Sequence, residues 1–181
     1  MNRLTVVVLL AILALPVVGH AQEQAQHPLQ LSLITPVQLF PETDPIHGVR
    51  LNIFYGRSEE MVGLDLGLVN HTTEEFRGVQ FGLAGLAEGH FKGVQVNNVN
   101  LVKGVMEGFQ WGFLNGVDEG RGVQLGAVNY ATVSHRGLEI GLVNYANSMN
   151  GIQIGFINII RHGAPFPVLP IVNWAGLDEG D

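Results

Sequence analysis

Apolar and polar residues alternate in a short unit that recurs along most of the chain. Each unit consists of glycine, an apolar residue, a polar residue, an apolar residue, a small residue, two apolar residues and asparagine, followed by a mostly polar connecting segment. Alternation with a period of two predicts a β-strand, and the Val, Ile, Leu and Phe of the apolar positions suit a pleated, half-buried surface. Eight units begin at Gly48, Gly63, Gly78, Gly93, Gly108, Gly122, Gly137 and Gly151.

The units follow one another at intervals of 14 or 15 residues. Two degenerate copies flank them, PLQLSLIT from Pro28 and FPVLPIVN from Phe166, which starts 15 residues after Gly151. Ten units therefore cover nearly all of the chain that follows its N-terminal segment. Regular repetition of one short β unit predicts an all-β repeat protein with a single domain, residues 22–175. Residues 176–181 form an acidic tail.

One strand-rich unit repeated ten times suits two architectures. In a β-solenoid each unit is one coil and equivalent residues stack in parallel columns. In an antiparallel meander each unit is one strand plus a turn, and the sheet can close into a barrel. The mixed spacing favours the solenoid, because a one-residue change in a meander turns every following side chain to the other face unless a bulge corrects it. Glycine at the start of each unit and asparagine at its end are expected to mark two bends of the coil, since both tolerate the left-handed conformation.

An outer-membrane β-barrel stays as the alternative to the solenoid. Like the solenoid, it is compatible with an exported chain, with strands of period two and with the absence of cysteine. Its weakness is the apolar face, which holds only three alternating positions before an asparagine or a charged residue. At about 3.3 Å per residue, that band is shorter than the roughly 25 Å of a lipid-facing surface.

The third position of each unit is polar. Amide side chains stacked one strand spacing apart can hydrogen-bond along the stack as a ladder, while a solvated strand face explains the same column. Arg50 and Asp65 occupy this column in consecutive units, so a parallel stack predicts that they lie about 4.8 Å apart along the stack. The column contains Arg50, Asp65, Gln80, Gln95, Gln110, Gln124, Glu139 and Gln153.

Residues 1–21 have the layout of a secretory signal peptide. Met1-Asn2-Arg3 supplies a positive start, residues 4–18 are nearly all apolar, and Gly19 and Ala21 are small residues placed for cleavage after Ala21. Fifteen apolar residues are short for a transmembrane anchor. We therefore expect export to the periplasm, the outer membrane or the cell surface. The chain contains no cysteine, which excludes disulfides and thiolate chemistry.

Charge and motifs exclude several classes of function. A net charge of −7 makes nucleic acid an unexpected partner. The sequence contains no nucleophile elbow, HExxH, P-loop or CxxC motif. It therefore predicts no catalytic, cofactor-binding or metal-binding residue, and no binding residue is identified. A hydrolytic enzyme is the weakest of the candidate functions.

Individual residues that often carry chemistry have structural interpretations here. Trp111 fits the apolar fourth position, which predicts a role in the core. The carboxylate pairs Glu74-Glu75 and Asp118-Glu119 fall in connecting segments, where solvated turns are expected. Four histidines occupy four different columns, so stacking does not gather them as metal ligands, and they are interpreted as surface residues: His71, His90, His135 and His162.

The motif GxQxGxxN, the segment LFPETDPIHGVRLNIFYG and the unit GLDLGLVN resemble a family of bacterial surface-repeat proteins first noticed in leptospires. The closing stretch PFPVLPIVNW, residues 165–174, is similar to that family's usual ending, and the resemblance covers about residues 28–175. It implies export and a surface or envelope location, and it brings no established activity. The chain departs from the pattern at Tyr55, Gly85 and Asn97-Asn98, where local bends are expected to differ.

These observations together predict an exported structural or interaction module without catalysis. Its partner is expected in the envelope or outside the cell, and its chemistry is not identified by the sequence. Association with a membrane stays open, and no cofactor is expected.

Overall fold

A computed structural model describes residues 26–176. The signal peptide predicted for residues 1–21 and residues 177–181 of the acidic tail lie outside this range. The described chain forms one sheet with the strand order β2-β1-β3-β4-β5, and no helix able to cross a membrane occurs within it. The strands are β1 His27–Ile34, β2 Val37–Gln38, β3 Ile46–Ala87, β4 His90–His162 and β5 Val168–Ala175.

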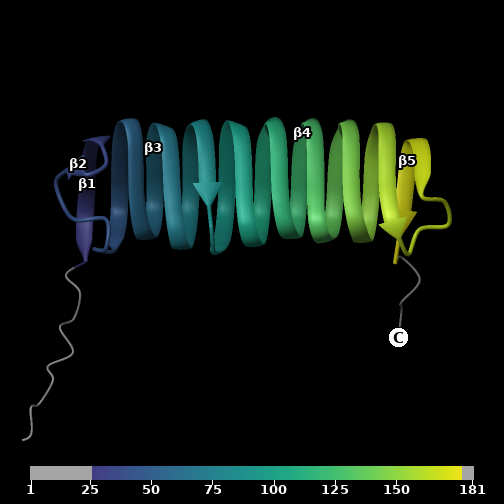
Figure 1. The fold of residues 1–181 in the computed structure, drawn as a ribbon, viewed down its shortest axis with the longest axis horizontal. Coiled ribbons are helices and arrows are strands. Elements are labelled where there is room, and N and C mark those ends of the chain that lie inside the picture. The colour runs from purple at the N-terminus through teal and green to yellow at the C-terminus, as the bar shows by residue number, and fades with distance from the viewer. Residues whose placement is uncertain (1–25, 177–181) are drawn as a thin grey trace, which may run out of the picture.

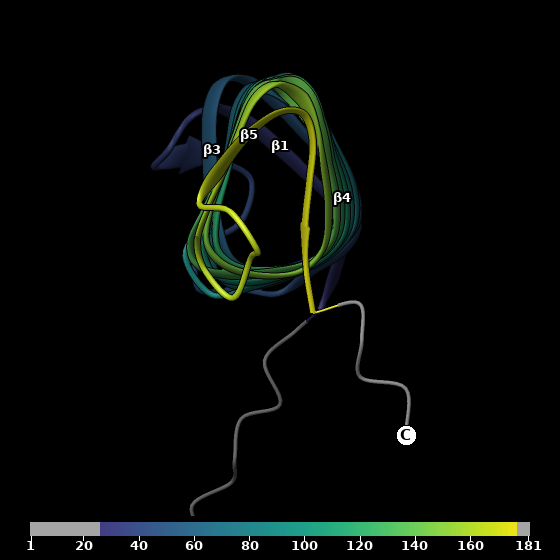
Figure 2. The same ribbon diagram turned by 90° about the vertical axis from the view of Figure 1, so that its right-hand side faces the viewer.

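The two long strands, β3 and β4, are wound into successive coils that stack along one axis (Figure 1). They pair in parallel, with Gly78 opposite Gly93 and Gln80 opposite Gln95. Viewed along the axis, the coils superpose on one another (Figure 2). The prediction of a β-solenoid is confirmed, and the antiparallel meander is wrong. A change between 14 and 15 residues is absorbed within one coil without moving the columns out of register.

Glycine and asparagine differ in how they shape the coil. The glycine that begins each of the eight units has a positive φ, between 126° and 157°, as at Gly93 with φ 142°. A side chain there is also blocked, because a Cβ on Gly93 would lie 1.9 Å from the carbonyl oxygen of Gly78. The predicted left-handed asparagine is wrong, since Ile171 is the one non-glycine residue of positive φ among residues 26–176.

The hydrophobic core comes from the connecting segments. Its side chains lie two residues before each unit's glycine or two residues after its eighth position, where the chain turns an apolar residue inward between polar neighbours. Phe76 and Phe91 stack in this way with ring centroids 4.6 Å apart. The core contains Ile46, Met61, Phe76, Ala87, Phe91, Val102, Met106, Val117, Ala131, Ala146, Met149, Ile160 and Ala175.

The alternating apolar positions of the units point outward. Trp111 is 56% exposed, so its predicted place in the core is wrong. The inward positions of the same strands hold glutamine, asparagine and glycine instead. Alternation fixes which residues share a face of a strand, but it does not fix which face is enclosed.

The two ends of the stack are built differently. At the N-terminal end, β1 continues the parallel columns, with Gln30 opposite Arg50, and β2 folds back against β1. At the C-terminal end, β5 runs antiparallel to β4, with Gln153 opposite Asn173. The unit from Phe166 is therefore no tenth coil in the parallel register, because the chain reverses after β4 and covers the edge of the last coil.

Removing residues 165–181 is expected to cause aggregation. The deletion strips β5 from the edge formed by residues 151–159 and leaves backbone donors and acceptors free to pair with another chain. Size-exclusion chromatography with light scattering measures the outcome. A chain shortened only by residues 177–181 keeps β5 and serves as the control. A soluble, monomeric chain without residues 165–181 would contradict the role of β5 as a cap.

Replacing Gly126 or Gly141 with valine is expected to destabilise the fold by more than about 1 kcal/mol. A Cβ on Gly126 would lie 2.3 Å from the carbonyl oxygen of Gly112, and one on Gly141 would lie 2.5 Å from that of Gly126. Urea unfolding measures the loss. Ala84→Val is the matched control, because the seventh position it occupies holds valine in several other units. Equal midpoints for all three variants would show that the fifth column tolerates a side chain.

Candidate functional site

The glutamines of the third column form a buried ladder. Each Nε2 donates to the Oε1 of the glutamine one coil before, at 2.9 Å from Gln95 to Gln80, 2.8 Å from Gln110 to Gln95 and 2.7 Å from Gln124 to Gln110. All four side chains are fully buried. The predicted ladder is confirmed, and the alternative of a solvated strand face is wrong. Stacked amides hydrogen-bond to one another without water, which explains how the interior of the coil can be polar.

The asparagines of the eighth column form a second ladder. Asn129 Nδ2 donates both to Asn144 Oδ1 at 2.8 Å and to the carbonyl of Ile140 at 2.9 Å. Asn115 and Asn144 repeat this pair of bonds one coil before and after. The asparagines donate toward the next coil, whereas the glutamines donate toward the preceding one. Each asparagine thus ties a side-chain ladder to the backbone of the neighbouring coil.

The departures from the motif are compensated by an asparagine in the fifth column. Gly85 lacks the amide of the eighth position, and Asn97 of the next coil fills that space, donating to Gln80 Oε1 at 3.3 Å and to Asn100 Oδ1 at 2.7 Å. Tyr55 likewise replaces an asparagine, and Asn52 donates to Asn70 Oδ1 at 2.9 Å. The expected local differences are therefore replacements: where the eighth column lacks an asparagine, an asparagine in the fifth column supplies the amide.

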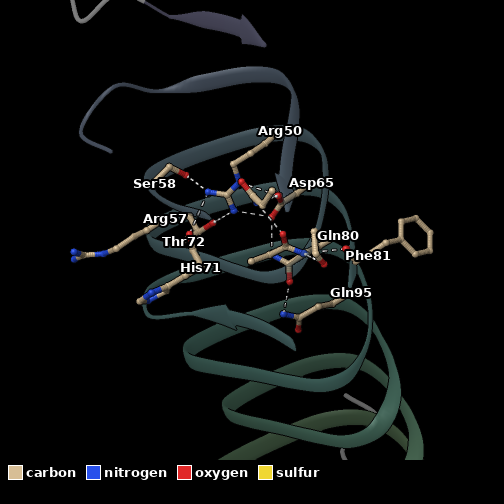
Figure 3. A network of polar contacts seen from close by, with 12 residues as sticks. Arg50, Arg57, Ser58, Asp65, His71, Thr72, Gln80, Phe81 and Gln95 are labelled. Carbon is tan, nitrogen blue, oxygen red and sulfur yellow. Dashed lines mark hydrogen bonds and ion pairs between the residues drawn. The ribbon is translucent and has the colours of Figure 1, made fainter. Parts of the chain in front are cut away.

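Arg50 and Asp65 form an ion pair at the N-terminal end of the glutamine ladder (Figure 3). Arg50 Nε donates to Asp65 Oδ1 at 2.8 Å, and Arg50 Nη2 donates to Asp65 Oδ2 at 2.6 Å. The predicted neighbours in a parallel stack are confirmed, and both side chains are fully buried. Gln80 Nε2 donates to Asp65 Oδ2 at 3.0 Å, which joins the pair to the ladder.

Further polar groups complete the shell around Arg50. Its Nη1 donates to the hydroxyl of Ser58 and to the carbonyl of His71, and its Nη2 lies 3.4 Å from the hydroxyl of Thr72. In Figure 3 these groups lie inside the coil, while the ring of Phe81 points away from the ladder. The guanidinium therefore donates to the Asp65 carboxylate and also to Ser58, Thr72 and the carbonyl of His71. This buried cluster is a structural element of the interior.

Glu139 interrupts the ladder in its C-terminal half. Gln153 Nε2 donates to Glu139 Oε2 at 2.7 Å, as a glutamine rung would require. Glu139 Oε1 and Gln124 Oε1, which belong to adjacent rungs, have no partner within the described residues. Burial raises the pKa of Glu139 to about 8, so near pH 7 the carboxyl is neutral. A neutral carboxyl carries a hydroxyl donor, and the oxygen of Gln124 on the adjacent rung is an acceptor without a partner.

His135 lies beside Glu139 in a column that elsewhere carries core residues. Its Nδ1 is 3.9 Å from Glu139 Oε1, and both side chains are fully buried. Burial lowers the pKa of His135 to about 4, opposed by the backbone at Gly122 and Leu138. The surface interpretation is therefore wrong for His135. The equivalent residue one coil before is Gly120, where a Cβ would lie 2.2 Å from His135 Nδ1, so the glycine leaves room for the ring.

The other residues considered for chemistry stay apart. His71 bonds Tyr55 and Glu88, whereas Glu75 pairs with Arg77 and Asp118 accepts a bond from Thr132. His90 and His162 are exposed. Between residues 26 and 176 no group of three or more histidine, aspartate or glutamate side chains is placed to hold a metal ion.

The outer surface of the coil divides into two unlike faces. We define the apolar face as the second, fourth, sixth and seventh positions of the eight units from Gly48 to Asn158. All of these residues are apolar except Asn98. The charged side chains lie on the connecting segments. Large side chains of the apolar face that are well exposed are Leu51, Ile53, Phe54, Leu68, Phe81, Leu83, Trp111, Phe113, Leu142, Ile154, Phe156 and Ile157.

The apolar face carries a ridge and a hollow near its middle. Phe113, 68% exposed, and Trp111 stand out from the sheet. In the sixth column Phe113 lies between the smaller Asn98 and Ala127 of the coils on either side. An open hollow of about 630 Å³ lies against the ridge and is floored by the glycines of the fifth column. It is lined by Gly82, Val96, Asn97, Asn98, Trp111, Gly112, Phe113, Leu125, Gly126 and Ala127.

The apolar face was not anticipated as a candidate site. The signal for it was present in the sequence as the absence of charge from four positions of every unit. That signal becomes informative only once these positions are known to face outward. Comparison of the chain with family models, curated proteins and solved structures found no match.

Proposed function

We propose that this chain is an exported, non-enzymatic protein of the envelope or cell surface that acts as an interaction module and binds its partner through the apolar face. The observation that carries the proposal is the apolar face itself, which runs over eight coils with Asn98 as its one polar residue and includes many well-exposed large side chains. Contiguous apolar surface beyond a few hundred Å² marks an interaction site in a soluble protein. The resemblance to surface-repeat proteins and the signal-peptide layout of residues 1–21 support the export.

The interior chemistry supports a module without catalysis. The groups with unusual protonation, Glu139 and His135, are enclosed by the coil and out of reach of a substrate. Asp65 is enclosed in the same way and is fully occupied by Arg50, Asn52 and Gln80. These groups hold the coils together, so the chemistry available to a partner is that of the outer surface.

Affinity capture from an envelope extract tests the binding role. The exported chain is expected to retain a partner, and Phe113→Asp, which places a charge on the ridge, is expected to lose it. Val133→Asp adds the same charge at an exposed site on a connecting segment and serves as the control. Equal capture by both variants would show that the apolar face is not the binding surface.

Fusion of residues 1–25 to a reporter enzyme that is active only outside the cytoplasm tests the export. An active reporter is expected. A reporter that stays inactive would overturn the exported location and leave the role of the apolar face to the capture experiment.

A further inference from the structure

We propose that the partner of the apolar face is a second copy of this chain, bound face to face with twofold symmetry so that the ridge of Trp111 and Phe113 of each copy enters the hollow of the other. The inference rests on the proposed binding role of the apolar face and names its occupant. Four properties of the face bear on it: its area, its lack of charge, the ion pairs at its border and the relief at its centre.

The area of the face fits a stable dimer of two equal copies. Eight coils at about 4.8 Å each, and five residue intervals of about 3.3 Å from the second to the seventh position, give a face of roughly 38 by 17 Å, or about 650 Å². Two such faces in contact would bury about 1,300 Å², and specific interfaces bury about 1,200–2,000 Å² in total. The face is therefore large enough to hold a copy of itself without help from other surfaces.

The distribution of charge permits two acidic copies to meet. The chain carries a net charge of −7, but the apolar face contributes nothing to it. The column nearest to the face, one residue before each glycine, contains one acidic side chain, Glu107, and four basic ones, Arg77, Lys92, Arg121 and Arg136. Because Arg77, Lys92 and Arg121 are paired with Glu75 and Glu107 of the same copy, the repulsion between the basic columns of two copies is reduced.

The same border argues against an anionic membrane as the occupant. Binding to an anionic leaflet relies on clustered lysine and arginine beside the apolar surface. Three of the basic side chains in this column are already paired with carboxylates of the protein. Arg77 pairs with Glu75 at 2.6 Å, and both Lys92 and Arg121 pair with Glu107, at 3.5 and 3.1 Å.

The relief at the centre of the face is self-complementary. Under a twofold axis, a contact from Phe113 of one copy to Ala127 of the other is repeated from the second copy to the first. The ridge then fills the hollow floored by Gly126 and bordered by Ala127, at the middle of the eight coils. Aromatic side chains at the centre of an interface, surrounded by apolar contacts, dominate binding energy.

Sedimentation velocity of the exported chain, produced from all 181 residues and measured from about 1 to 100 µM, tests the proposal. A dimer is expected. Phe113→Asp is expected to raise the dimer dissociation constant at least 30-fold, whereas Val133→Asp is expected to leave it unchanged. Circular dichroism confirms that each variant is folded, and both sites are exposed.

A second variant distinguishes dimerisation that depends on the shape of the face from nonspecific association of apolar surfaces. Ala127→Phe keeps the face apolar and fills the hollow, and it is expected to weaken the dimer at least tenfold. Unchanged dimerisation of both Ala127→Phe and Phe113→Asp would overturn the proposal, as would a monomer at 100 µM. Flotation with vesicles of phosphatidylcholine and phosphatidylglycerol tests whether the apolar face binds lipid. If the wild type floated with the vesicles and Phe113→Asp did not, lipid would be the occupant instead of a second copy. A monomeric chain that still captures a partner through Phe113 would overturn the dimer and uphold the proposed function.

Discussion

Replacing Asp65 with alanine is expected to lower the free energy of unfolding by about 3–5 kcal/mol, the cost of leaving a buried charge without its partner. Arg50 would keep its bonds to Ser58, Thr72 and the carbonyl of His71 but would lose both carboxylate oxygens. The guanidinium is fully buried, so water cannot replace them. Chemical unfolding monitored by circular dichroism measures the loss.

The double variant Arg50→Gln/Asp65→Gln is the informative control. It removes both charges and extends the glutamine column from Gln80 toward the N-terminal end, where Gln30 already lies opposite residue 50. Because a buried ion pair replaced as a whole costs far less than one broken in half, the double variant is expected to recover most of the stability. A double variant as unstable as Asp65→Ala would mean that the charges themselves are required. A single variant close to wild type would mean that the pair is not enclosed.

Glu139→Gln is expected to stabilise the protein at and above pH 8 and to remove a loss of stability that the wild type shows between pH 6.5 and 8. The folded state raises the pKa of Glu139 from 4.5 to about 8, so it holds a proton that the unfolded chain releases. Stability from this group is complete below pH 4.5 and is lost as the pH rises toward 8, at up to about 1.4 kcal/mol per pH unit. Glutamine at this position is expected to continue the ladder with an amide donor that does not titrate.

His135 contributes the opposite slope on the acid side. Its pKa falls from 6.5 to about 4 on folding, so its stability is present above pH 6.5 and is lost as the pH falls toward 4. Between about pH 4.5 and 6.5 the two slopes oppose each other, and the wild type is expected to show a plateau there. His135→Met, which restores the residue found at Met61, Met106 and Met149 in the same column, should remove the acid loss alone.

Urea unfolding at half-unit steps from pH 4 to 9 measures both effects. The wild type, Glu139→Gln and His135→Met are compared at each pH, and Glu75→Gln, an exposed carboxylate paired with Arg77, is the control for a change of charge alone. If Glu139→Gln followed the wild type through pH 6.5–8, the carboxyl would be ionised throughout and the ladder would be interrupted at neutral pH.

The spacing and order of the repeats determine the fold of this chain to a large extent. Glycine every 14 or 15 residues favours the parallel stack, because parallel columns absorb both spacings without a correcting bulge. The same register places Arg50 beside Asp65 and stacks the glutamines, and both are confirmed. These are consequences of connectivity: once one coil lies on the next, residues a full coil apart must be neighbours.

The true core residues, which the strand pattern did not predict, also follow a regular pattern along the sequence. An apolar residue occurs two positions before the glycine in six of the eight units, and this regularity in an otherwise polar segment marks the true core: Ile46, Met61, Phe76, Phe91, Met106 and Met149. His135 belongs to that column and is buried for that reason. The hydrophobic pattern of the strands is stronger than this signal, and it led to the expectation that Trp111 is enclosed.

Which face of the strands is enclosed was decided only by the tertiary structure. Period-two alternation offers two faces, and the apolar one is ordinarily turned inward to remove it from water. Here the side chains that the eight-residue units turn inward are mainly amides. Each Gln and Asn hydrogen-bonds to residues of the coils before and after it, and an isolated strand cannot supply those partners. The reversal of β5 and the neutral state of Glu139 depend in the same way on neighbours that exist only in the stack. The sequence by itself thus determined the columns and their register, whereas the enclosure of polar ladders and the exposure of the apolar face depend on hydrogen bonds between coils that form only when the whole solenoid is assembled.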